Sequence, residues 1–168
     1  MKVRSRIACL ALVLSFALTG SAFAHEPVVK GMPLYVQNIA PAAMPAVRVV
    51  DAFTAAIQAA KFDVATKLLD PKVLILESGS SEHSRDEYMG HHAIADAAFL
   101  QNAEIQQRYR QAQIDGKLAW VATESLLHTK QDGKDIVLFS TETMLLKKTA
   151  AGWKIVHIHW SSHPAPQG

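Results

Sequence analysis

The stretch Trp153-Lys154-Ile155-Val156-His157-Ile158-His159-Trp160-Ser161 decides the fold. It is rich in β-branched and aromatic residues that partly alternate with polar ones, which is typical of a β-strand. Three similar segments precede it, at residues 104–114, 118–129 and 136–148. Residues 115–116, 131–133 and 150–152 between the segments each contain glycine and favour turns. The pattern therefore predicts a four-stranded antiparallel meander.

The residues before this meander have helical patterns. Pro45 suits a first helical turn, and Val47, Val50, Phe53 and Ile57 follow at the spacing of one helix face. This spacing predicts an amphipathic helix.

A shorter helix follows, for which Asp63 is the predicted cap and Pro71 the stop. Residues 73–77 predict a strand. Ser84 and Glu87 form a capping-box pattern that predicts a helix through about Leu100. Helices before strands indicate an α+β fold, with the helices on one face of a curved sheet.

The first 24 residues read as a cleavable signal peptide. They begin with three basic residues, continue through an apolar run at residues 7–18, and end on Ala22-Phe23-Ala24. This predicts export, to the periplasm of a bacterium, without a stable membrane anchor. Residues 25–45 contain four prolines and no sustained period, so we interpret them as an arm.

Charge and cysteine content exclude two classes of protein. Without residues 1–24 the chain has 14 basic against 15 acidic residues, so it lacks the positive charge of a nucleic-acid binder. The single cysteine, Cys9, lies in the predicted leader. An exported fold of this sequence therefore has to be stable without disulfides. All eight histidines lie after residue 24.

The order of elements and the ending at residues 153–161 resemble the nuclear transport factor 2-like superfamily. Within it, the chain is similar to SnoaL-like domains and to the association domain of calcium/calmodulin-dependent kinase II. The resemblance covers residues 46–164 and leaves 165–168 as a tail. It implies a cone-shaped, strongly curved antiparallel sheet wrapped around a long helix, with a pocket at the wide end. It also implies homo-oligomers that form through the sheet.

The resemblance also implies which residues face the pocket. Arginines line the pocket of the kinase association domain, and Ala122, Met144 and Trp160 occupy their positions here. Val156, Ile158 and Trp160 would point inward, and Glu124 and Glu142 would lie on the same side. Tyr88, Trp120, Met144 and Trp160 are the expected walls. Such a pocket suits a small apolar or cationic molecule rather than an anion.

Glu124 and Glu142 are the first candidates for chemistry. They lie on strands joined by the hairpin at Gly133 and are expected to be roughly level across it. Two carboxylates in an apolar cavity raise each other's pKa, so one could act as a general acid or base, or the pair could bind a cation. The alternative is that one or both face solvent or pair with Lys or Arg.

His92 is the third catalytic candidate. Asp96 follows it by one helical turn and is expected to orient its ring, which suits a general base or a metal ligand. The alternative is a hydrogen-bonded histidine with a structural role.

Five histidines are candidates for metal binding. His157 and His159 alternate on the last strand and share a face, as does His163. If cleavage follows Ala24, the new amino terminus at His25 could chelate copper together with a second histidine such as His83. The alternative is that the histidines on the last strand make ordinary strand contacts.

The sequence thus predicts a SnoaL-like domain that binds a small molecule, with cofactor-free isomerase, dehydratase or cyclase activity as the enzymatic possibility. Two alternatives stay open: copper or zinc handling outside the cytoplasm, and an oligomerisation module with a vestigial pocket. The sequence contains no Gly-rich phosphate loop, no G-x-S-x-G elbow and no H-E-x-x-H motif.

Overall fold

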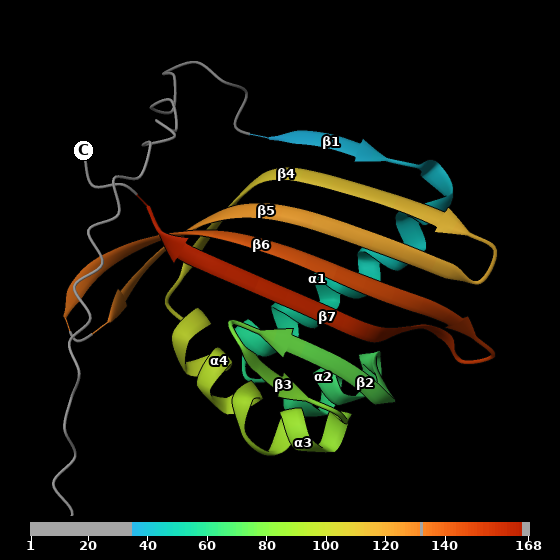
Figure 1. Ribbon diagram of the computed structural model, residues 1–168, viewed down its shortest axis with the longest axis horizontal. Helices are drawn as coiled ribbons and strands as arrows, with labels where there is room; N and C mark the ends of the chain where they lie inside the picture. The colour runs from blue at the N-terminus through green and yellow to red at the C-terminus, as the bar shows by residue number, and fades with distance from the viewer. Residues whose placement is uncertain (1–34, 132, 166–168) are drawn as a thin grey trace, which may run out of the picture. The chain divides into compact units, whose positions relative to one another are not determined.

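The structure of the protein is a computed structural model that describes residues 35–131 and 133–165, all of which belong to one unit beginning at Pro33 (Figure 1). The predicted signal peptide, His25 and most of the C-terminal tail lie outside the described residues. In chain order the elements are β1 (Val36–Ile39), a 3-10 turn (Pro41–Ala43), α1 (Met44–Gln58), α2 (Phe62–Leu68), β2 (Leu69–Glu77), β3 (Ser80–Glu82), α3 (Arg85–Gly90), α4 (His92–Leu100), β4 (Glu104–Asp115), β5 (Leu118–Gln131), β6 (Lys134–Thr149) and β7 (Gly152–Pro164).

The predicted meander forms the centre of a seven-stranded sheet with the order β1-β4-β5-β6-β7-β2-β3 (Figure 1). Two-residue loops join its strands, since Asp115 pairs with Leu118 and Thr149 pairs with Gly152. Gly116 in the first loop has a φ of 57°, a left-handed conformation that glycine adopts without strain. The α+β fold with a curved sheet is therefore confirmed.

Parallel pairing extends the meander at both edges, so that the sheet is mixed rather than purely antiparallel. β1 pairs with β4, and β2 pairs with β7. β1 lies inside the predicted arm at residues 25–45, where its four residues are too few to show an alternating pattern.

The helices form largely where the sequence predicts them. Val47, Val50, Phe53 and Ile57 make up the buried face of α1. The predicted cap of α2 is one residue off, because Lys61 precedes the helix and Asp63 lies in its first turn. Such an aspartate still favours a helix, since it complements the positive end of the helix dipole.

The predicted helix from Ser84 to Leu100 is two helices. Ser84 caps α3 as expected, since its Oγ accepts a hydrogen bond from the backbone N–H of Glu87 at 3.1 Å. The helix then breaks at His91, whose φ of −135° and ψ of −78° are not helical. α4 starts afresh at His92 with a new direction, and this places Asp96 and Phe99 over the sheet.

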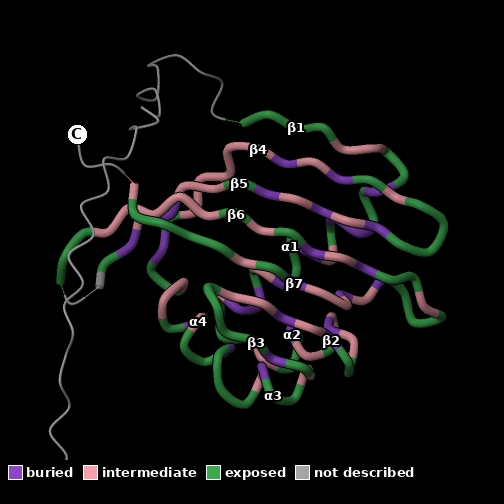
Figure 2. The backbone as a smooth tube through the Cα atoms, viewed as in Figure 1, coloured by how far each residue is buried: buried purple, intermediate pink, exposed green. Residues whose placement is uncertain are grey.

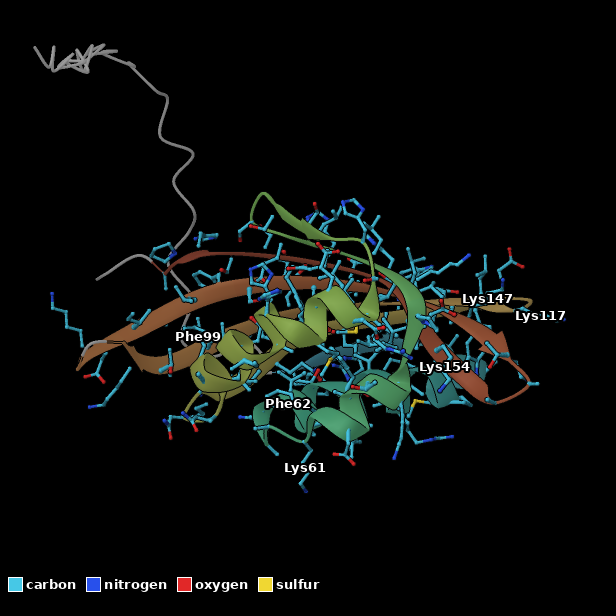
Figure 3. The ribbon with its side chains drawn as sticks, turned by 90° about the horizontal axis from the view of Figure 1, so that it is seen from below. Lys61, Phe62, Phe99, Lys117, Lys147 and Lys154 are labelled. Atoms are coloured by element: carbon cyan, nitrogen blue, oxygen red, sulfur yellow. The ribbon has the colours of Figure 1, made fainter. Side chains whose placement is uncertain are left out.

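The helices cover one face of the sheet, and the core lies between them (Figure 3). Buried and exposed residues alternate along the central strands (Figure 2). Five fully buried residues, one from each of five adjacent strands, form a row that we call the core row: Ala112, Val121, Met144, Ile158 and Ile75. No helix among the described residues is long and apolar enough to cross a membrane.

Candidate functional site

A cavity of about 430 Å³ opens between the inner face of the sheet and helices α1 and α4. Its helical wall is largely apolar, with Phe53, Ile57, Phe99 and Leu100, and carries one carboxyl group, that of Asp96. Phe99 marks the end of the sheet that lies far from Lys117 and Lys147, which are labelled at the other end (Figure 3). A cavity of this size suits a small organic ligand.

The sheet wall of the cavity is polar and is built in rows, each with one residue from each adjacent strand. Next to the core row is the acid row: Arg110, Thr123, Glu142, Trp160 and Glu77. The hydroxyl row follows, with Gln107, Ser125, Ser140 and Ser162, and then an apolar rim of Ile105, Leu127 and Leu138. Because side chains alternate along a strand, residues two apart enter successive rows, except on β4, where a bulge places Arg110 and Gln107 in successive rows.

Glu142 lies at the centre of the acid row. Its Oε2 accepts a hydrogen bond from the indole Nε1 of Trp160 at 2.8 Å. Burial raises the pKa of Glu142, whereas the hydrogen bond from Trp160 and the positive charge of Arg110 lower it. The carboxyl group is thus fixed in direction and partly desolvated, which suits proton transfer.

Arg110 is a buried guanidinium in the cavity wall that sequence reasoning missed. It forms an ion pair with Asp51 of α1, and its Nε donates to Thr123 Oγ1 at 3.2 Å. The amide oxygen of Gln107, turned toward it, accepts from the same Nε at 3.0 Å. These partners occupy the guanidinium, so Arg110 is better placed to orient its neighbours than to bind an anionic ligand.

Two more carboxyl groups, those of Asp96 and Glu77, lie on the side of Trp160 away from Glu142. The hydroxyl of Tyr88 donates to Asp96 Oδ2 at 2.8 Å, and Glu77 at the end of β2 lies nearby. Burial raises the pKa of Asp96, and the Tyr88 hydrogen bond lowers it. Burial also raises the pKa of Glu77, the charge of Asp96 raises it further, and His92 lowers it. From the sequence, Glu77 had no expected role in the cavity, and Asp96 was expected only to orient the ring of His92.

The structure places two of the predicted pocket residues in the cavity and two beneath it. Glu142 and Trp160 line the cavity. Met144 belongs to the core row, and Tyr88 is fully buried behind the cavity wall. Tyr88 reaches the cavity only through its hydrogen bond to Asp96.

The predicted facing of β5 needs correction. Glu124 is exposed, and Trp120 lies on the same outer face of the sheet. The hairpin pairs Gln131 with Lys134, which places Glu124 opposite Thr141 and not level with Glu142. Residues 121, 123, 125 and 127 therefore face inward, and Ala122 faces outward.

The last strand shows a related correction. A β-bulge in β7 shifts the register between the pairs Leu145–His157 and Leu146–Ile155. Ile155 is therefore fully buried in place of Val156, while Ile158 and Trp160 keep their predicted facing.

His92 lies on the surface rather than in the cavity. Its ring pairs with the carboxylate of Glu82, and the side chains of the two residues are 46% and 4% exposed. Asp96 was the expected partner of His92, but it accepts from Tyr88 instead. The break at His91 explains the difference, because His92 begins α4 and its side chain reaches the neighbouring strand β3.

Of the histidines proposed as metal ligands, His157 and His159 share the outer face of β7, and His83 follows β3. His83 and His159 are exposed, and the ring Nδ1 of His157 lies 2.9 Å from the carbonyl oxygen of Leu74. Among residues 35–131 and 133–165, no group of three His, Cys, Asp or Glu side chains could hold a metal ion. His25 is outside the described residues.

Comparisons with known structures agree with this architecture. A protein from Shewanella frigidimarina NCIMB 400, provisionally described as a ketosteroid isomerase, is 34% identical, with a TM-score of 0.68 over 74% of this chain and 99% of that one. A provisionally assigned dehydratase of the NTF2-like family from Streptomyces avermitilis is 17% identical, with a TM-score of 0.63 over 75% and 97%. The calcium/calmodulin-dependent kinase II hub of S. rosetta is 21% identical, with a TM-score of 0.61 over 74% and 98%. At such identities the last two show the fold alone.

Sequence comparison assigns the family. A search among curated proteins found no match. The model of the SnoaL-like domain family matches residues 47–166, which include strands β2 to β7 and all four α-helices except the first residues of α1. The chain therefore belongs to the SnoaL-like domain family.

Proposed function

We propose that this protein binds a small, largely apolar molecule in the cavity and moves a proton on it without a cofactor, as an isomerase or a dehydratase does. The observation that carries the proposal is the carboxyl group of Glu142. The indole Nε1 of Trp160 donates a hydrogen bond to this carboxyl group at 2.8 Å, and the helical wall of the cavity opposite it is largely apolar.

Glu142 is suited to act as the base. Burial raises its pKa toward the range where a carboxylate removes a proton effectively, and Arg110 and the Trp160 donor favour the ionised form. A carbon next to a carbonyl group is the expected source of the proton, because its conjugate base is stabilised as an enolate. The hydroxyls of Ser125 and Ser140 in the next row can donate to an uncharged oxygen of the ligand.

The test uses a β,γ-unsaturated 3-ketosteroid, chosen because the Shewanella relative is described as a ketosteroid isomerase. Isomerisation gives a conjugated enone, which is followed by ultraviolet absorbance. Glu142→Gln should lower the rate by about 10²- to 10⁴-fold, because it removes the general base. Glu124→Gln is the matched control, since the same change is made on the outer face of β5. Absence of conversion by the wild-type protein, or equal losses in the two variants, would contradict the proposal.

We also propose that the protein acts outside the cytoplasm. Only the sequence of residues 1–24 supports this, through its basic start, apolar run and small residues at the end. Intact-mass measurement of the protein purified from its native cells should show an amino terminus at His25. A mass that includes residues 1–24 would contradict export by cleavage.

A further inference from the structure

Three carboxyl groups line the cavity, and the proposed mechanism uses only Glu142. Glu77 and Glu142 belong to the same acid row, since each pairs across a strand boundary with Trp160. Their backbones are therefore two strand spacings apart, about 10 Å. From either side of Trp160, the two side chains can reach one ligand in the cavity.

A rigid aromatic cluster fixes the geometry between the two sides. Phe53, Tyr88 and Trp160 pack together with ring centroids 6.1 to 6.4 Å apart. Trp160 holds Glu142, and Tyr88 holds Asp96 beside Glu77. Donors of this packed unit therefore hold Glu142 on one side and Asp96 on the other, and Glu77 lies on the Asp96 side, where the charge of Asp96 acts on it.

Burial raises the pKa of both Glu142 and Glu77, but the strongest effect of a neighbouring group lowers the pKa of Glu142 and raises that of Glu77. At Glu142, the Trp160 donor and the Arg110 charge favour the carboxylate. At the other side, Tyr88 donates to Asp96 and so favours the ionised form of Asp96. The Asp96 charge and burial both favour a proton on Glu77, against the opposing effect of His92. A cavity with one carboxylate and one carboxylic acid can remove one proton and supply another in a single step.

We propose that Glu77 is a second catalytic residue, which gives its proton to a leaving hydroxyl group while Glu142 takes a proton from the adjacent carbon. The reaction is then the loss of water from an uncharged β-hydroxy ketone. This inference rests on the proposed role of Glu142 as the base. Asp96 and Tyr88 are given the role of positioning residues, because the charge of Asp96 acts on Glu77 and Tyr88 holds Asp96 by a hydrogen bond.

The step is balanced without any further reactant. The Glu142 carboxylate takes the proton on the α-carbon, and the electrons of that C–H bond form the new C=C bond. The C–O bond breaks, and its electron pair leaves with the oxygen, which takes the proton of Glu77 and departs as water. Glu142 ends protonated and Glu77 ionised, and proton exchange with solvent restores both.

A pair of probes separates this inference from the proposed function. A 5-hydroxy-3-ketosteroid loses water to give the same conjugated enone that the β,γ-unsaturated 3-ketosteroid gives by isomerisation. Both reactions remove a proton from the same carbon, but only the dehydration has a leaving hydroxyl group. Glu77→Gln should therefore lower the dehydration rate about 100-fold and change the isomerisation rate less than about threefold. Glu142→Gln should lower both rates, and Glu124→Gln neither.

A second variant tests the same residue through pH. Asp96→Asn removes the charge that raises the pKa of Glu77, so Glu77 should lose its proton at lower pH. The alkaline limb of the dehydration profile should move to lower pH, whereas a purely structural role of Asp96 would leave the limb in place. The titratable groups that act on Glu77 are Asp96 and His92 of α4, and its own charge acts on Tyr88 of α3.

Each outcome decides between the two proposals. Loss of dehydration alone in Glu77→Gln, with the pH shift in Asp96→Asn, supports the inference. Wild-type protein that isomerises but does not dehydrate overturns the inference and leaves the proposed function. Equal rates of dehydration in the wild type and Glu77→Gln also overturn it. Wild-type protein that does neither overturns both.

Discussion

Strands β5 and β6 each carry one glutamate near the middle, and the structure treats the two glutamates in opposite ways. Glu142 faces the cavity, and Glu124 faces outward from the other side of the sheet. Because Gln131 pairs with Lys134, every even-numbered residue of β5 lies opposite an odd-numbered residue of β6. The length of one hairpin loop thus decides which carboxyl group faces the cavity.

The same type of side chain has a different environment on each face of the sheet. A carboxylate on the inner face loses water, which raises the pKa of Glu142, and it gains the Trp160 donor and the Arg110 charge, which lower that pKa. A carboxylate on the outer face keeps its water, so exchanging it for an amide changes little. Matched substitutions on the two faces are therefore the sharpest tests of the register.

The largest expected difference concerns adjacent residues of β6. Met144→Ala should lower the free energy of unfolding by about 2–5 kcal/mol, because Met144 is fully buried in the core row. Leu145→Ala, one residue along on the outer face, should cost less than about 1 kcal/mol. Urea unfolding of both variants measures the two values. Similar losses would mean that the assigned facing of β6 is wrong.

The next comparison sets an inner tryptophan against an outer one. Trp160→Phe removes the donor to Glu142 and should lower ketosteroid isomerisation about tenfold, with a loss of about 1–3 kcal/mol in unfolding free energy. Trp120→Phe on β5 should leave the isomerisation rate unchanged. Both rates are measured by the enone absorbance. Equal losses of activity in the two variants would contradict the different roles assigned to the inner and the outer tryptophan.

The smallest effect is the pH dependence of stability. The pKa of Glu142 is raised in the folded protein above its ordinary value of 4.5, so the folded state binds this proton more tightly than the unfolded chain. Stability from this residue is present below pH 4.5 and is lost as pH rises through the raised pKa. Glu142→Gln should therefore be more stable than the wild type at neutral pH, and the gain should disappear at acidic pH.

Urea titrations at several pH values measure this dependence. Glu124→Gln is the control, and its unfolding curves should follow those of the wild type throughout. A wild-type stability that stays higher than that of Glu142→Gln at neutral pH would contradict the assignment of a desolvated carboxyl group.

The sequence was sufficient for the elements that depend on local chemistry. Glycines in the hairpin loops and alternation along the strands predict the meander, and Ser84 predicts the start of α3. The break at His91 was harder to predict, because Gly90 lies in an otherwise helical pattern. A single glycine there lowers helix propensity without fixing a break.

The candidate site depended on strand register, which alternation alone does not determine. Bulges shift the register in β4 at Arg108 and in β7 at Val156, and each bulge reverses the facing of all residues beyond it. The first places Arg110 on the inner face together with Gln107, three residues before it, and the second explains why Val156 does not face inward as expected. On β5, by contrast, the two-residue loop before Lys134 was a usable signal that places Thr123, not Glu124, beside Glu142.

The acid row takes one side chain from each of five strands, and the core row beneath it supplies the packing. The residues that stabilise the fold are therefore different from the residues that carry the proposed chemistry. A single substitution in the acid row can alter one proton donor or acceptor while the backbone that carries its neighbours stays in place. Descendants of one ancestral domain can thus diverge in the reaction they catalyse long before they diverge in shape.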